Sequence, residues 1–292
     1  MFHAGYVAIM GAPNVGKSTL MNSMLDQKLA ITSSRAQTTR HRILGILNGS
    51  DHQVIFLDTP GIIEPKYVLQ EVMMKTAQRT MRGADLILLI IDAVHSRTIP
   101  CDFMEQLKAL SVPVFLCVNK VDLADKNNLL PVMESHDRMH LFQEIVPVSA
   151  LKHVGLDVLK ELIIKALPAG EPFYPQDMIS DEPERFFVAE LIREQIYTNY
   201  GEEIPYSSAV LIEEFIERPG RKDFVHAVIH VERDSQKGIL IGKGGRSLKK
   251  TGRLARENIE LFLGRPVFLQ LDVRVRKKWR RDESQVRRLG YG

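Results

Sequence analysis

A glycine-rich segment near the start of the chain carries a lysine and a serine at a spacing suited to phosphate chemistry. Residues 11–18 match G-x-x-x-x-G-K-[ST] and follow an apolar stretch at Tyr6–Met10. Glycines let backbone N–H groups face a phosphate chain, and a helix N-terminus favours negative charge. We expect Lys17 to reach the β- and γ-phosphates and the Ser18 hydroxyl to hold Mg²⁺. The predicted phosphate-binding residues are Gly11, Ala12, Pro13, Asn14, Val15, Gly16, Lys17 and Ser18.

A second short motif, with a carboxylate and a glycine, follows the apolar stretch Gln53–Asp58. A carboxylate at the end of a strand can order the water shell of Mg²⁺, and a glycine N–H can sense the γ-phosphate. By itself such a sequence is typical of an ordinary turn, so the prediction of a functional loop depends on its position after this stretch. The predicted residues of this loop are Asp58, Thr59, Pro60 and Gly61.

A third motif closes the apolar stretch Val112–Asn119 and predicts which base is bound. Guanine presents N1–H and the 2-amino group on one edge, where the Asp122 carboxylate can accept both. Adenine offers no such pair, so GTP should be preferred over ATP by about 10⁴-fold. Ser149-Ala150, after the last apolar stretch, is expected to add a backbone contact to the guanine O6. The predicted base-side residues are Asn119, Lys120, Val121, Asp122, Ser149 and Ala150.

Ile62 occupies the position after Gly61 where Ras-like proteins carry a glutamine that orients the attacking water. An aliphatic side chain neither donates nor accepts a hydrogen bond. We therefore interpret Ile62 as a packing residue beside the nucleotide. Water must then be positioned by backbone groups, a second water or a partner, and intrinsic turnover should be at or below roughly 10⁻² s⁻¹.

The elements that would position these motifs alternate between strands and helices. Most of the strand candidates are continuous apolar runs, which indicates a mostly parallel sheet covered on both faces. Arg42–Leu47 is expected to form an antiparallel edge strand. The predicted domains are a phosphate-loop α/β domain at residues 1–168, a linker at 169–182 rich in proline and glycine, and a small α+β domain at 183–292.

Composition narrows the class of protein further. The 292 residues are 45% hydrophobic and 26% charged, which is typical of a globular chain. Two cysteines are too few for a disulfide framework, and the chain shows no secretory signal and no long apolar run. We therefore expect a cytoplasmic protein.

Charge is unevenly distributed along the chain. Residues 235–292 hold 16 basic and 5 acidic residues, a net charge of +11, whereas the remainder has a net charge of −8. Such an asymmetry indicates a polyanionic partner, although a solvated helical face would produce it too.

Four residues in the basic part suggest which polyanion is bound. Gly242, Lys243, Gly244 and Gly245 lie between two helical stretches, with Lys249 and Lys250 nearby. The surrounding order α-β-β-α-α-β resembles the prokaryotic KH module, whose glycine loop clamps about four nucleotides of single-stranded RNA. We expect the bases to lie over a groove formed by a helix and the strand that contains Val210–Ile212. Trp279, in a predicted basic terminal helix, could stack on a base, but packing is the more common role of a lone tryptophan.

The two halves together resemble the Era family of GTPases, and the motifs that carry the resemblance are those given above. The resemblance implies hydrolysis of GTP to GDP with Mg²⁺, held by Ser18, Asp58 and Thr39, the threonine of a T-R dipeptide, with Thr38 as the alternative. The catalytic residues would be Lys17, Thr39, Gly61 and Asn14, the last by helping to hold K⁺. The implied partners are the 3′ end of small-subunit ribosomal RNA, the maturing small subunit and the inner face of the membrane. The chain is expected to be a monomer.

Two other functions fit parts of the sequence. One is a GTPase of tRNA modification, against which the lack of a long helical insertion and of a C-terminal catalytic cysteine argues. The other is an RNA-binding scaffold in which GTP is only structural. Very slow hydrolysis with tight nucleotide retention would favour the scaffold.

Overall fold

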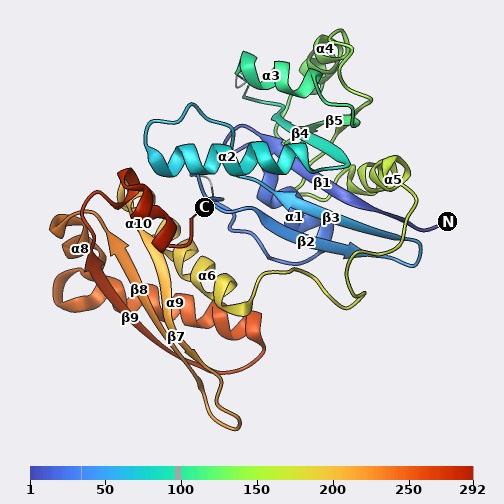
Figure 1. Cartoon of the computed structure of the whole chain (residues 1–292). Helices are drawn as coiled ribbons and strands as arrows, with labels where there is room; N and C mark the ends of the chain where they lie inside the picture. The colour runs from blue at the N-terminus through green and yellow to red at the C-terminus, as the bar shows by residue number, and fades with distance from the viewer. Residues whose placement is uncertain (34, 96–99, 292) are drawn as a thin grey trace. The chain divides into compact units, whose positions relative to one another are not determined.

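The structure is a computed structural model that describes residues 1–33, 35–95 and 100–291 (Figure 1). It contains two compact units, each considered by itself. The first comprises Met1–Pro65 and Met73–Asp181, and the second Lys66–Val72 and Glu182–Gly292. Ser34, in the polar segment before Thr39, lies outside the described residues.

The first unit is built on a six-stranded sheet with the order β2-β3-β1-β4-β5-β6. All neighbouring strands are parallel except β2 and β3, so the predicted mostly parallel sheet with one antiparallel edge strand is confirmed. Every residue of β3 and β5 is buried, which explains why their central residues are all apolar. The strands are β1 (His3–Gly11), β2 (Ile43–Asn48), β3 (His52–Asp58), β4 (Leu86–Asp92), β5 (Val114–Asn119) and β6 (Glu144–Pro147).

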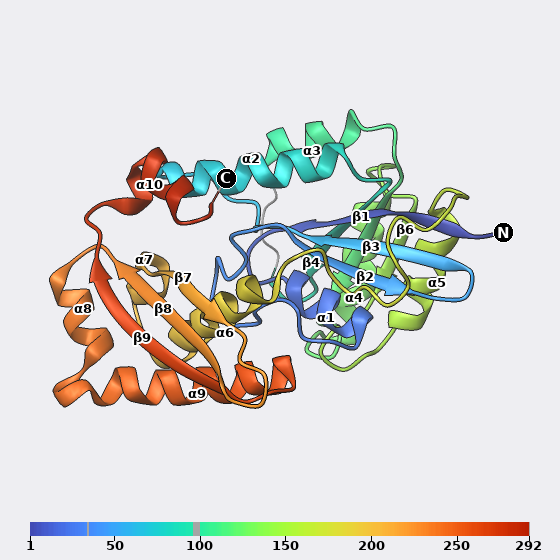
Figure 2. The same cartoon turned by 60° about the horizontal axis from the view of Figure 1, so that its bottom comes forward.

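Helices cover both faces of this sheet (Figure 2). Apolar side chains of α2, α3 and α4 form one core with alternate residues of β1, β4 and β5, while α1 and α5 lie on the other side. The loops after parallel strands therefore gather at one edge of the sheet, where the sequence motifs lie. The helices are α1 (Lys17–Leu25), α2 (Val68–Arg82), α3 (Cys101–Lys108), α4 (Lys126–Asp137) and α5 (Leu156–Ala166).

The segment expected to be a linker at 169–182 is packed on the first unit as far as Asp181. Gln53 of β3 accepts hydrogen bonds from the backbone N–H groups of Phe173 and Tyr174. Further along, the Ile46 N–H of β2 donates to the Ile179 carbonyl at 2.9 Å. Proline and glycine in this segment thus mark an extended strap along the sheet edge rather than a free connection.

The second unit has a three-stranded sheet with the order β7-β8-β9, antiparallel between β7 and β8 and parallel between β8 and β9. Ile192, Leu240 and Ile259, from three helices, share one core with the sheet, as expected of a small α+β domain. The elements are α6 (Glu184–Asn199), α7 (Ile204–Ser207), β7 (Ala209–Ile216), β8 (Asp223–Val231), α8 (Asp234–Ile241), the 3₁₀ turn η1 (Lys243–Gly245), α9 (Arg246–Leu263), β9 (Val267–Val275), the 3₁₀ turn η2 (Trp279–Arg281) and α10 (Glu283–Arg288).

The basic C-terminal segment is not the single helix that the sequence predicted. It forms the turn η2 and the six-residue helix α10. Trp279 is fully buried, and its Nε1–H donates to the Ser207 carbonyl at 2.9 Å. Its ring also stacks on Tyr291. The tryptophan therefore serves the packing of this unit, and the alternative role of stacking on a base is wrong.

Candidate guanine-nucleotide and RNA sites

A cavity of about 390 Å³ opens at the edge of the first sheet where the parallel strands end. Asn14, Lys17, Ser18, Thr39 and Gly61 all line it, although they come from three separate loops. The structure thus brings the two predicted phosphate-side motifs together around one space.

The segment from Gly11 to Ser18 contains backbone conformations that glycine and asparagine adopt more readily than other residues. Gly16 has a φ of 101°, and a Cβ there would lie 2.2 Å from Asn119 Nδ2. Asn14 also has a positive φ, of 65°, a conformation that asparagine tolerates better than most residues. The Lys17 ammonium donates to the carbonyls of Gly11 and Ala12, at 3.1 and 2.9 Å. Lysine is therefore held at the mouth of the loop that would surround the phosphates.

Two hydroxyls and a carboxylate meet beside this loop. Asp58 Oδ2 accepts hydrogen bonds from Ser18 Oγ at 2.6 Å and Thr39 Oγ1 at 3.1 Å, and the two hydroxyl oxygens are 2.8 Å apart. Thr39 rather than Thr38 makes these contacts. The three predicted magnesium ligands consequently form one cluster.

The environment of Asp58 fits a bound cation. The side chain is fully buried, and burial raises the pKa of its carboxyl group against the opposing effects of Lys17, Ser18 and Thr39. Its Oδ1 is buried with no hydrogen-bond partner in the described part of the chain. Elsewhere in that part, no group of three His, Cys, Asp or Glu side chains could hold a metal. Mg²⁺ would thus be held by one carboxylate, two hydroxyls and phosphate oxygens.

The residues after Asp58 pack against the phosphate loop. Thr59 Oγ1 donates to the Ile9 carbonyl at 2.7 Å, and a Cβ on Gly61 would lie 2.9 Å from Pro13. The Ile62 N–H donates to the Gly11 carbonyl at 3.0 Å, and its side chain belongs to the core under α2. The interpretation of Ile62 as a packing residue agrees with this burial.

The base-side motif ties three loops together. Asn119 Nδ2 donates to the Val15 carbonyl at 2.8 Å, and Asn119 Oδ1 accepts from the Ala150 N–H at 3.0 Å. Ser149 Oγ donates to Asp122 Oδ1 at 2.5 Å. In this structure the Ala150 N–H, expected to face guanine O6, is directed to Asn119, while Ser149 orients the carboxylate that would read the base.

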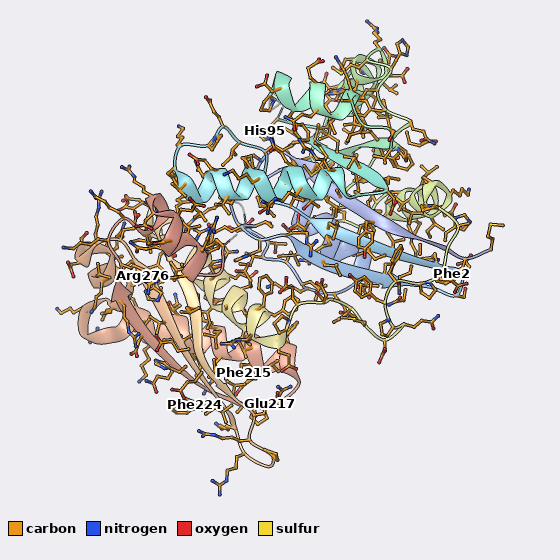
Figure 3. All side chains as sticks on the ribbon, viewed as in Figure 1. Phe2, His95, Phe215, Glu217, Phe224 and Arg276 are labelled. Atoms are coloured by element: carbon orange, nitrogen blue, oxygen red, sulfur yellow. The ribbon has the colours of Figure 1, made fainter. Side chains whose placement is uncertain are left out.

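Sequence reasoning missed Asp92 and His95, which line the same cavity. Asp92 ends β4, and His95, labelled in Figure 3, follows in the next loop. Burial raises the pKa of the Asp92 carboxyl, but hydrogen bonds from Lys120 and two backbone N–H groups outweigh it and lower the pKa. The signal was available: a carboxylate at the end of a parallel strand is the same feature that singled out Asp58.

The glycine loop of the second unit joins α8 to α9. Gly242, Gly244 and Gly245 all have positive φ values, of 71°, 61° and 75°. A Cβ on Gly242 would lie 2.2 Å from Ser247 Oγ, whereas nothing lies within 4 Å of one on Gly244 or Gly245. The first glycine is therefore needed for the turn, and the two others leave the loop surface open to a close ligand.

A groove of about 830 Å³ starts at this loop and runs between α9 and β9. Its floor includes the aliphatic side chains of Leu269 and Leu271 from β9, and its charged residues are Arg246, Lys249, Lys250, Arg253 and Arg256. The prediction that this groove lies over Val210–Ile212 is wrong, because β7 lies at the other edge of the sheet from β9, and Val210 and Ile212 belong to the core.

Known proteins resemble the chain along its whole length. GTPase Era of Heliobacterium modesticaldum is 47% identical over 99% of this chain and 97% of its own length. GTPase Era of Syntrophus aciditrophicus is 45% identical over 100% and 96%. The chain belongs to the GTPase Era family. As a member of this family it is an enzyme that hydrolyses GTP.

Domain and structure comparisons agree with membership of the Era family. Residues 6–120 match the family described as 50S ribosome-binding GTPase, and residues 203–280 match the KH domain. A variant of Era from Aquifex aeolicus bound to GDP and AlF₄⁻ has a TM-score of 0.95, with 44% identity and full coverage of both chains. The same values hold for Era in complex with MgGDPNP and nucleotides 1506–1542 of 16S ribosomal RNA.

One further property of this Era family chain concerns membranes. In the part of the chain that the structure describes, no helix combines the length and apolar character needed to span a bilayer.

Proposed function

We propose that this Era family GTPase binds the 3′ end of small-subunit ribosomal RNA through its KH unit and acts in assembly of the small subunit. The observation that carries this proposal is the full-length similarity to an Era bound to nucleotides 1506–1542 of 16S ribosomal RNA. The glycine loop and the cationic groove beside it supply the chemistry: charge for the phosphates and an aliphatic floor for the bases.

In the nucleotide site, the proposal assigns Lys17 to the β- and γ-phosphates and the cluster of Ser18, Thr39 and Asp58 to Mg²⁺. Magnesium, when bound, would neutralise charge on the phosphates. We assign the Gly61 N–H to the γ-phosphate and the Asp122 carboxylate to guanine. These roles are supported by the shared cavity, the buried carboxylate and the hydrogen bond that orients Asp122.

The side chain at position 62, an isoleucine, cannot orient the attacking water during GTP hydrolysis in this chain. The buried Ile62 leaves that task to backbone groups, a second water or a partner, which supports slow intrinsic turnover. Asn14, at the cavity wall, is proposed to help hold K⁺ near the phosphates. Turnover should then be several-fold faster in KCl than in NaCl at equal ionic strength, and equal rates in the two salts would contradict the role of K⁺.

RNA binding and the GTPase cycle are expected to be coupled. An RNA that binds the GTP-bound and GDP-bound forms with different affinities must in turn change the relative affinities for GTP and GDP. GTP turnover is measured with and without a short single-stranded RNA that matches the 3′ end of small-subunit ribosomal RNA. We expect stimulation by this RNA and none by a scrambled RNA of the same composition. Binding and turnover that are identical for the two RNAs would leave a GTPase with an unidentified polyanionic partner.

The alternative functions have less support. The alignments with two relatives named GTPase Era span 97% of the length of those relatives, which favours an Era protein over a GTPase of tRNA modification. Within the Era assignment, we also propose a cytoplasmic monomer whose basic C-terminal segment makes peripheral contact with the anionic inner face of the membrane. The excess of 16 basic over 5 acidic residues at 235–292 supports that contact.

A further inference from the structure

The Asp92 carboxylate is placed at the meeting point of three segments of the first unit. Its Oδ1 accepts hydrogen bonds from the N–H groups of Val94 and His95, at 2.9 and 3.1 Å. Its Oδ2 accepts one from the Lys120 ammonium at 2.7 Å. The Asp92 side chain is only 5% exposed and that of Lys120 30%, so the carboxylate of this ion pair is shielded from solvent.

Lys120 carries the connection on to the phosphate loop. Its ammonium also donates to the Asn14 carbonyl at 2.8 Å, and its backbone has a φ of 67°. A non-glycine residue in the left-handed region costs free energy and persists only where its surroundings hold it. Asp92 and the Asn14 carbonyl are the two groups that fix the end of this side chain.

We propose that Asp92 is a positioning residue for guanine-nucleotide binding. It holds Lys120 against the phosphate loop, and so fixes the segment from Asn119 to Asp122 relative to the phosphates. Without the carboxylate, the Lys120 ammonium has no anionic partner at this place and is free to turn toward solvent or the nucleotide. The segment that carries the base-reading carboxylate is then tied to the phosphate loop mainly by the Asn119–Val15 hydrogen bond, so the distance of Asp122 from the phosphate site is held less tightly. This inference rests on the proposed role of Asp122.

The test is Asp92→Asn in the full chain, because an amide still has an oxygen to accept from Val94 and His95 but removes the charge that attracts Lys120. Dissociation rates of fluorescent GDP and fluorescent IDP are measured, since inosine lacks the 2-amino group that Asp122 would accept. We expect GDP to dissociate about 10- to 100-fold faster, the preference for GDP over IDP to fall by about 10-fold, and kcat at saturating GTP to change less than threefold.

Two further variants separate positioning from general stability. Asp85→Asn changes a carboxylate just before the same strand, where it accepts from the Tyr6 N–H, and should leave both rates unchanged. Combining Asp92→Asn with Lys120→Gln restores a neutral hydrogen-bonding pair and should recover part of the GDP preference lost in Asp92→Asn alone.

The outcomes distinguish the possible errors. If Asp92→Asn loses GDP and IDP affinity equally, and Asp85→Asn does the same, Asp92 has only a structural role and the inference is overturned. The inference is also overturned if the dissociation rates of GDP and IDP from Asp92→Asn stay within twofold of those from the unaltered chain. If the unaltered chain itself fails to prefer GDP over IDP, the role of Asp122 fails and the inference falls with it.

Discussion

Replacing Asp122 with asparagine is expected to reduce GTP affinity by about 10⁴-fold. The carboxylate can accept from both guanine N1–H and the 2-amino group, whereas the asparagine side chain presents an amide donor to one of these two donors. The carboxylate already has a defined direction, since Ser149 Oγ donates to it at 2.5 Å. Xanthine carries an oxygen in place of the 2-amino group, so the variant should bind xanthosine triphosphate better than the unaltered chain does. Equilibrium titrations with fluorescent GTP and fluorescent xanthosine triphosphate measure both effects.

The control for this variant is Asp125→Asn, three residues further along the chain. Asp125 is exposed and accepts from the Asn127 N–H as the N-cap of α4, a role that asparagine fulfils equally well. Its GTP affinity should be unchanged. Retention of GTP affinity in the Asp122 variant would refute the assignment of the carboxylate to the base.

A second large effect is expected in the other unit from Gly244→Asp. An added carboxylate at the tip of the loop would repel a phosphate held there, and at about 4 Å such repulsion amounts to roughly 1–4 kcal/mol. We expect RNA affinity to fall by about 5- to 1,000-fold while GTP affinity stays the same. The fold should tolerate the change at a modest cost, because aspartate enters the left-handed region at φ 61° more readily than most residues and nothing lies within 4 Å of the new Cβ. Filter binding with the 3′-end RNA measures the loss.

Gly220→Asp provides a closely matched comparison. Gly220 also has a positive φ, of 73°, with nothing within 4 Å of its Cβ, but it lies in the hairpin between β7 and β8. The same charge at that place should leave RNA binding nearly unchanged. If Gly244→Asp binds RNA as well as Gly220→Asp, the glycine loop does not hold the RNA, and the basic C-terminal segment becomes the better candidate.

Much of the first unit could be predicted because its strands are buried on both faces and end in polar motifs. The middle of β3 and nearly all of β5 are apolar, and each strand ends in a polar residue, so the loops after them are readable. The roles of Ser18 and Asp58 followed from that reading, whereas Thr39 was expected from the resemblance to the Era family. The register between neighbouring strands could not be predicted from the sequence. Asp92 pairs with Asn119 between β4 and β5, which places it beside Lys120. No pattern within either strand indicates this pairing.

The errors in the second unit have the same origin. The order β7-β8-β9 decides which strand borders the groove, and periodicity within Val210–Ile212 says nothing of sheet order. Trp279 was ambiguous because its partners, Ser207 and Tyr291, are reached only through the folded chain. Sequence thus identified the glycine loop and its charges, but not the strand that completes the groove.

The strap at 169–181 has a consequence for how the first unit can exist alone. It covers the open side of β2, where Asn48 Nδ2 donates to the Met178 carbonyl and Ser180 Oγ to the Leu44 carbonyl, at 3.0 and 2.6 Å. A fragment cut at Pro168 would expose this side, and uncovered strand edges recruit other chains. Such a fragment would tend to self-associate, whereas one that ends at Asp181 keeps its own protection against aggregation.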